Sequence, residues 1–226
     1  MTGQNGPAAI DSTMATMYLH TQVKQQVATV GAVERSNSAV LVTVLPVATL
    51  LDRRSVDLTQ GLPTHPHHHE GSWSVGRYLG TPGARTVSLP EAVALVDRVR
   101  SAAARGAEES LEALAATVPV RIATIAIRAC PVLPSTTEAR IADNRAQAVA
   151  DSVMYREDLA GAARARGWGV YWYDRDQVSL DAAAALRGEN LDTVLVAMAR
   201  SAGPSWQARH KLAAAAALAA ATGRCQ

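Results

Sequence analysis

The chain has 226 residues, of which 48% are hydrophobic, and this length and apolar content suit one globular domain of ordinary size. Its formal net charge of +2 permits a nucleic-acid partner but lacks the dense basic character of a dedicated nucleic-acid binder. No apolar run is long enough to span a bilayer, and Cys130 and Cys225 have no metal-ligand spacing. These features predict a cytoplasmic protein without a membrane partner.

Near the N-terminus the sequence predicts a flexible extension over residues 1–38, followed by a single domain over 39–226. Residues 1–17 are rich in small and polar residues and lack the basic region and apolar run of a signal peptide. Residues 18–34 fit either a strand or a short helix. The β-branched run at 39–44 and the alternating pattern at 50–58 then predict a pair of strands.

The middle of the chain combines a turn-rich loop, a helical region and an apolar strand. A third strand is predicted at 73–79, after the loop. Ser88 and Glu91 form a capping box that predicts a helix start, and Gly106 is a weak point in the helical pattern that follows. Residues 120–127 are almost wholly apolar, which indicates a strand covered on both faces.

The last third of the chain predicts one long helix, an aromatic strand and further helices. The long helix begins at Ser135 or Thr136 and ends at Gly167. The strand covers 168–173, and helices follow at 180–186, 191–199 and 205–221. The chain has no Walker loop, no GxGxxG and no GxSxG motif, which argues against a P-loop hydrolase, a Rossmann enzyme and an α/β-hydrolase.

This order of elements, together with several short stretches, resembles RuvC-type Holliday-junction resolvases of the ribonuclease H-like superfamily. VTVLP at 42–46 is similar to the opening strand of those enzymes. Leu45 stands where that strand has an Asp. AIR at 126–128 is similar to their central strand, with Arg128 at the position of a catalytic Glu. The final helix is similar to their closing helix and carries His210 where a metal ligand is expected. The resemblance implies an α/β, ribonuclease H-like mixed sheet of about five strands flanked by helices.

The chain also resembles a group of bacterial proteins with the signatures LPTHPxHHE and ADxVMYR, a resemblance that implies no particular activity.

The departures from the RuvC pattern bear directly on function. Two-metal phosphodiester hydrolysis needs several carboxylates around hard cations, and Leu45 and Arg128 cannot supply them. We therefore expect a divergent ribonuclease H-like protein without two-metal nuclease activity, acting as a nucleic-acid-binding or interaction module. Two alternatives stay open. One is an active metal-dependent nuclease with a relocated catalytic site of Glu70, Asp151 and His210. The other is an assembly subunit without nucleic-acid affinity.

The loop THPHHHE concentrates the candidate metal ligands His67, His68 and His69 beside Glu70. Imidazoles and a carboxylate suit a transition metal, and an adjacent His and Glu can act as an acid–base couple. The sequence assigns no cofactor, although a divalent metal would fit. A solvated surface loop gives the same pattern.

A polar stripe on the long helix supplies the remaining candidates. Asn144, Gln147, Asp151 and Tyr155 recur at spacings of three and four, so they share one helix face. Together with Arg145 and Arg128 they are candidate binding residues, although a solvated helix face has the same pattern. A buried Asp151 would need Arg145 or Arg128 as a partner. Nucleic acid, another protein and a second copy of the chain all stay open as partners.

Overall fold

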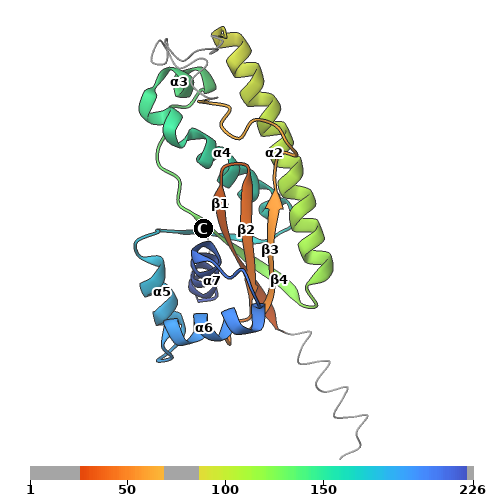
Figure 1. Cartoon of the computed structure of the whole chain (residues 1–226), viewed down its shortest axis with the longest axis vertical. Helices are drawn as coiled ribbons and strands as arrows, with labels where there is room; N and C mark the ends of the chain where they lie inside the picture. The colour runs from red at the N-terminus through yellow and green to blue at the C-terminus, as the bar shows by residue number, and fades with distance from the viewer. Residues whose placement is uncertain (1–25, 69–86, 223–226) are drawn as a thin grey trace, which may run out of the picture.

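In the computed structural model, which describes residues 26–68 and 87–222, a five-stranded mixed sheet forms the centre of the chain (Figure 1). The strand order is β3-β2-β1-β4-β5. Strands β1, β2 and β3 form an antiparallel meander, while β4 and β5 run parallel to β1. The strand bounds are β1 Val27–Arg35, β2 Ser38–Val44, β3 Leu50–Asp57, β4 Arg121–Arg128 and β5 Gly169–Tyr173. The predicted α/β fold, with a mixed sheet of about five strands flanked by helices, is confirmed.

The central strand is β1, which begins before the predicted domain boundary at residue 39. Residues 27–38 belong to the sheet and not to a flexible extension, so the predicted boundary at residue 39 falls inside the β1–β2 hairpin. The middle position of the sheet belongs to β1, between β2 and β4. Six consecutive residues of β1 are buried because both faces of this strand are covered, and such burial removes the alternation that identifies a half-exposed strand. Residues 1–25 and the predicted strand at 73–79 lie outside the described residues.

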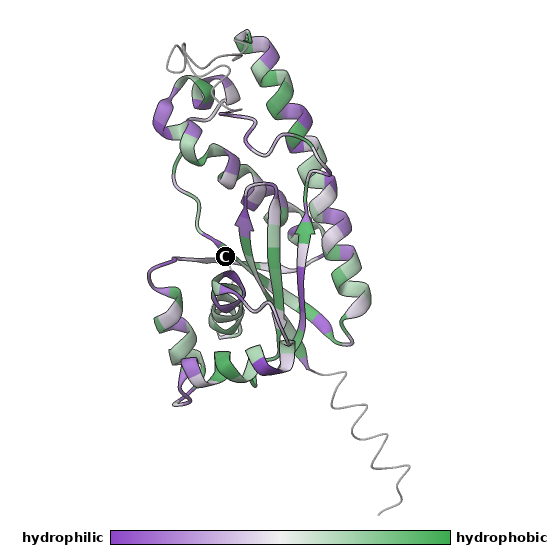
Figure 2. Ribbon diagram, in the orientation of Figure 1, coloured by the Kyte–Doolittle hydropathy of each residue, from purple (hydrophilic) through white to green (hydrophobic). Residues whose placement is uncertain are grey.

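Helices cover both faces of the sheet (Figure 1). Helices α2, α3 and α4 pack on one face, and α5, α6 and α7 pack on the other. Hydrophobic residues follow the strands and α7, where the two layers meet the sheet (Figure 2). The helix bounds are α2 Leu89–Thr117, α3 Thr137–Ala142, α4 Asn144–Ala165, α5 Val178–Ala185, α6 Leu191–Ala202 and α7 Ala208–Ala220.

The predicted long helix is divided into α3 and α4 at Asp143. The carboxylate of Asp143 accepts hydrogen bonds from the backbone N–H groups of Arg145 and Ala146, so Asp143 ends α3 and caps α4. Those backbone donors also lower the pKa of Asp143. The predicted helix end at Gly167 is confirmed, since Gly167 has a φ of 73° that glycine adopts without strain. The capping box of Ser88 and Glu91 is also confirmed.

At two glycines, the backbone of one segment packs directly against the backbone of another. At Gly31 of β1, a Cβ would lie 1.8 Å from the carbonyl oxygen of Ala213 in α7. At Gly106, a Cβ would lie 2.3 Å from the carbonyl oxygen of Leu58, and α2 continues through this residue without a break. Gly106 is therefore a packing contact and not a weak point of the helix. No helix in the described ranges has the length and apolarity needed to cross a membrane.

Candidate functional site

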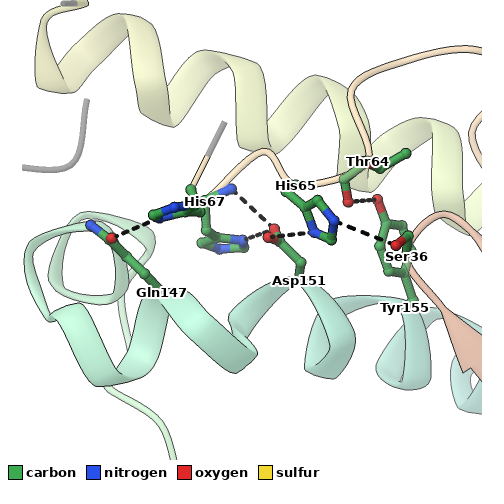
Figure 3. A network of polar contacts seen from close by, with 8 residues as sticks. Ser36, Thr64, His65, His67, Gln147, Asp151 and Tyr155 are labelled. Atoms are coloured by element: carbon green, nitrogen blue, oxygen red, sulfur yellow. Dashed lines mark hydrogen bonds and ion pairs between the residues drawn. The ribbon is translucent and has the colours of Figure 1, made fainter. Parts of the chain in front are cut away.

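The loop at residues 59–68 lies along one face of α4, on the predicted polar stripe (Figure 3). Gln147, Asp151 and Tyr155 are spaced four residues apart, and each of them contacts this loop. The Tyr155 hydroxyl donates a hydrogen bond to the carbonyl oxygen of Thr64 at 3.0 Å. The stripe therefore holds a loop in place and is not a solvated helix face.

Asp151 is the centre of this contact. Its side chain is only 8% exposed, and Oδ1 accepts a hydrogen bond from the backbone N–H of His67 at 3.0 Å. The same oxygen lies 2.7 Å from Nδ1 of His67, whose side chain is fully buried. Asp151 is buried as expected, but its partners are histidines of the loop and not Arg145 or Arg128. A buried carboxylate with these donors fixes the orientation of the imidazole.

His65 lies on the other oxygen of Asp151 (Figure 3). Its Nδ1 is 3.6 Å from Oδ2 of Asp151, and its Nε2 is 3.4 Å from Oγ of Ser36. Ser36 sits in the turn between β1 and β2 with a φ of 51°, in the left-handed region. Sequence reasoning missed Ser36 because nothing in its neighbourhood in the chain relates it to residues 65 and 151.

Of the candidate metal ligands, the structure describes His67 and His68. Nδ1 of His68 lies 3.3 Å from Oε1 of Gln147, and the amide of Gln147 also donates to the carbonyl oxygen of Ile141. Within residues 26–68 and 87–222, no three His, Cys, Asp or Glu side chains are placed to hold a metal ion. His69 and Glu70 lie outside the described residues.

His210 does not join Asp151. It belongs to α7, whereas Asp151 belongs to α4 on the opposite face of the sheet. Nδ1 of His210 accepts a hydrogen bond from the backbone N–H of Gln207 at the start of α7, and its ring stacks on Trp206 at 5.5 Å. Burial, followed by Arg53 and Arg209, lowers the pKa of His210. These contacts give His210 a structural role at a helix start.

Asn144 and Arg145 begin α4 and are exposed. They line an open hollow of about 820 Å³ together with Asp143 and residues of α3 and the preceding loop. Neither of their side chains contacts the loop at 59–68 in the part of the chain that the structure describes.

The carboxyl ends of the parallel strands form a second candidate region. Strands β1 and β4 end in Arg35 and Arg128, and Arg175 follows β5 by two residues. Parallel strands end at the same edge of a sheet, so the three guanidinium groups belong to one edge. None of them forms an ion pair within the described residues. Burial raises the pKa of Tyr173 on this edge, while Arg128 and Arg175 act in the opposite direction, so both lie within electrostatic reach of its hydroxyl.

One carboxylate on this edge is already paired. The side chains of Glu34 and Arg156 are 7% and 6% exposed and form an ion pair at 2.5 Å. Arg156 also donates to the carbonyl oxygen of Ala129, just beyond β4. This pair joins α4 to the ends of β1 and β4.

The position of Leu45 corrects the alignment drawn from the sequence. Leu45 follows β2, which runs antiparallel to β1, so Leu45 lies at the edge of the sheet opposite to Arg128. The strand that opens the sheet and runs parallel to β4 is β1, and Glu34 is near its carboxyl end. A carboxylate does exist at that end, but Arg156 neutralises it.

The buried carboxyl group of Asp158 in α4 should make the stability of the protein depend on pH. Burial, offset in part by Arg100, raises the pKa of Asp158 to about 7, and its Oδ2 has no hydrogen-bond partner among the described residues. The folded protein therefore keeps this proton between about pH 4 and 7, where the unfolded chain has lost it, so the contribution of Asp158 to stability falls as pH rises through this range. We expect Asp158→Asn to raise the free energy of unfolding by about 2–3 kcal/mol at pH 8 and by much less at pH 4. Urea denaturation of both proteins across this pH range measures the difference, and a gain independent of pH would contradict it.

No family model matches the chain, and no curated protein matches it. Among solved structures, the chain is similar to RuvC from Thermus thermophilus in complex with a Holliday junction substrate, with 15% identity and a TM-score of 0.44. The match covers 85% of this chain and 91% of that chain. A second Thermus thermophilus RuvC structure has 13% identity and a TM-score of 0.41, with coverage of 85% and 92%.

Proposed function

We propose that this protein is a nucleic-acid-binding module that contacts the phosphate backbone through the carboxyl edge of β1, β4 and β5, without two-metal cleavage at that edge. The observation that carries the proposal is the set of Arg35, Arg128 and Arg175, which lie at or just after the carboxyl ends of three neighbouring parallel strands. Guanidinium groups recognise phosphate oxygens in a bidentate manner and remain charged at every physiological pH.

The charges on this edge favour an anion over a metal ion. A pair of Mg²⁺ ions needs several unpaired carboxylates, and Glu34 is taken by Arg156. Asp174, which follows β5, accepts hydrogen bonds from the backbone N–H groups of Asp176 and Gln177 and so shapes the turn before α5. The positive charge that remains on Arg128 and Arg175 would repel cations and attract a polyanion.

The test compares charge reversals at the carboxyl edge of the parallel strands with a charge reversal at the opposite edge. Arg128→Glu combined with Arg175→Glu removes cations from the carboxyl edge, whereas Arg121→Glu changes an exposed arginine at the amino end of β4. We expect the double variant to bind duplex, single-stranded and junction DNA at least about 10-fold more weakly than the wild-type protein. The slope of log affinity against log salt concentration should fall by the equivalent of roughly one to two phosphate contacts. Fluorescence anisotropy over a salt series measures both quantities.

The control variant shows whether DNA binding depends on the carboxyl edge and not on positive charge elsewhere on the protein. Arg121→Glu should bind DNA nearly as well as the wild-type protein, since its charge lies at the far edge. Equal binding by the double variant and Arg121→Glu would reject the proposal. Incubation of the wild-type protein with the same DNA and Mg²⁺ or Mn²⁺ should leave the DNA intact, and cleavage would show that the protein is a nuclease.

A further inference from the structure

We propose that Ser36, His65 and Asp151 form a second, hydrolytic site, in which Ser36 is the nucleophile for carboxylic esters. This site is independent of nucleic-acid binding. The three side chains follow the order of a nucleophile, a base and an orienting carboxylate. Oγ of Ser36 faces Nε2 of His65, and Nδ1 of His65 faces Oδ2 of Asp151 (Figure 3).

The two carboxylate oxygens of Asp151 have different partners. Oδ1 is held by the backbone N–H and the ring of His67, which anchors the carboxylate, and Oδ2 is left facing His65. A proton on Nδ1 of His65 would face Oδ2 of Asp151, and this tautomer leaves Nε2 as the acceptor for the hydroxyl of Ser36. The two distances are 3.4 Å from Oγ of Ser36 to Nε2 of His65 and 3.6 Å from Nδ1 of His65 to Oδ2 of Asp151, and catalytic hydrogen bonds commonly shorten when a substrate binds.

The backbone on both sides of the pair is held in place. The loop that carries His65 is fixed by the hydrogen bond from Tyr155 to Thr64, and by a turn in which the N–H of His68 donates to the carbonyl oxygen of His65. The turn that carries Ser36 is fixed through Asn37, whose carbonyl oxygen accepts from the N–H of Leu58 and whose side chain donates to Thr59. These contacts keep the nucleophile and the base at a constant separation.

The exposure of the groups suits attack on a substrate from solvent. The side chain of His65 is 55% exposed and Ser36 is half-buried, while Asp151 is shielded. An imidazole with this exposure suits small esters with a good leaving group.

The reaction has two balanced steps. The oxygen of Ser36 attacks the ester carbonyl while its proton passes to Nε2 of His65, and the C–O bond to the alcohol breaks as that alcohol takes the proton from Nε2. Water then loses a proton to Nε2 and attacks the acyl-serine carbonyl. The acid is released as Oγ recovers its proton. No oxidant, reductant or metal ion takes part.

The experiment uses the full chain and two probes, p-nitrophenyl acetate for turnover and a fluorophosphonate for covalent labelling. We expect slow ester hydrolysis and a single adduct on Ser36, located by mass spectrometry of the digested protein. Ser36→Gly should abolish both signals, and its melting temperature should be equal or higher, because glycine adopts the left-handed conformation of residue 36 without strain. His65→Ala should reduce hydrolysis at least about 100-fold.

A second serine in the same hairpin provides the control. Oγ of Ser38 donates to the carbonyl oxygen of Arg35 and does not contact His65, so Ser38→Ala should keep wild-type labelling and turnover. An absence of labelling, an adduct on another residue, or labelling that persists in Ser36→Gly would each overturn the proposal.

Discussion

Gly31→Ala is expected to destabilise the fold by at least about 3 kcal/mol, because the added methyl group would lie 1.8 Å from the carbonyl oxygen of Ala213 and 2.9 Å from the backbone N of Ala217. Both neighbours are backbone atoms, so neither can move aside as a flexible side chain would. Thr29 lies beside this contact and donates a hydrogen bond to the carbonyl oxygen of Ala217 at 2.8 Å. Separating β1 from α7 to admit the methyl group would weaken that bond as well.

The matched control is Gly161→Ala. Gly161 lies in α4, and a Cβ there would meet nothing within 4 Å. Alanine in an exposed helical position is favoured over glycine, so this variant should gain about 0.5–1 kcal/mol. Urea denaturation monitored by circular dichroism compares the two variants with the wild-type protein. A Gly31→Ala protein as stable as Gly161→Ala would show that α7 does not approach β1 as described.

Arg156→Met should cost about 3–5 kcal/mol, because it leaves the buried carboxylate of Glu34 without its partner. The carbonyl oxygen of Ala129 would lose a donor in the same change. Combining Arg156→Met with Glu34→Gln removes both charges, so the double variant should be more stable than Arg156→Met alone. Thermal and urea unfolding of the set give the coupling energy through a double-mutant cycle.

An exposed ion pair provides the comparison for this buried one. Arg166 lies 3.4 Å from Glu112, whose side chain is 75% exposed, so Glu112→Gln should change the free energy of unfolding by less than about 1 kcal/mol. If Arg156→Met had an effect as small as this, the ion pair with Glu34 would not join α4 to the sheet, and the description of the carboxyl edge would be wrong.

Local patterns in the sequence determined most of the elements, and tertiary packing decided where they meet. Capping chemistry predicted the start of α2 at Ser88, because a capping box satisfies backbone donors within four residues of chain. Apolar runs predicted β2 and β4 for the same local reason. The position of β1 was not predictable, since VATVGAVER mixes Ala, Gly and Thr with Val and so lacks the continuous β-branched or apolar run that identified β2 and β4.

The same distinction between local pattern and tertiary packing applies to the candidate sites. Helical spacing by itself placed Gln147, Asp151 and Tyr155 on one face, because residues four apart on a helix are neighbours. Only the fold decided that this face would hold His65 and His67, and that Ser36 would lie against His65 from a segment 29 residues away. The direction of β2 likewise separated Leu45 from Arg128, because the chain alone does not reveal whether two strands run parallel. Contacts between distant segments depend on strand direction and packing, which are properties of the whole domain and not of any short stretch of it.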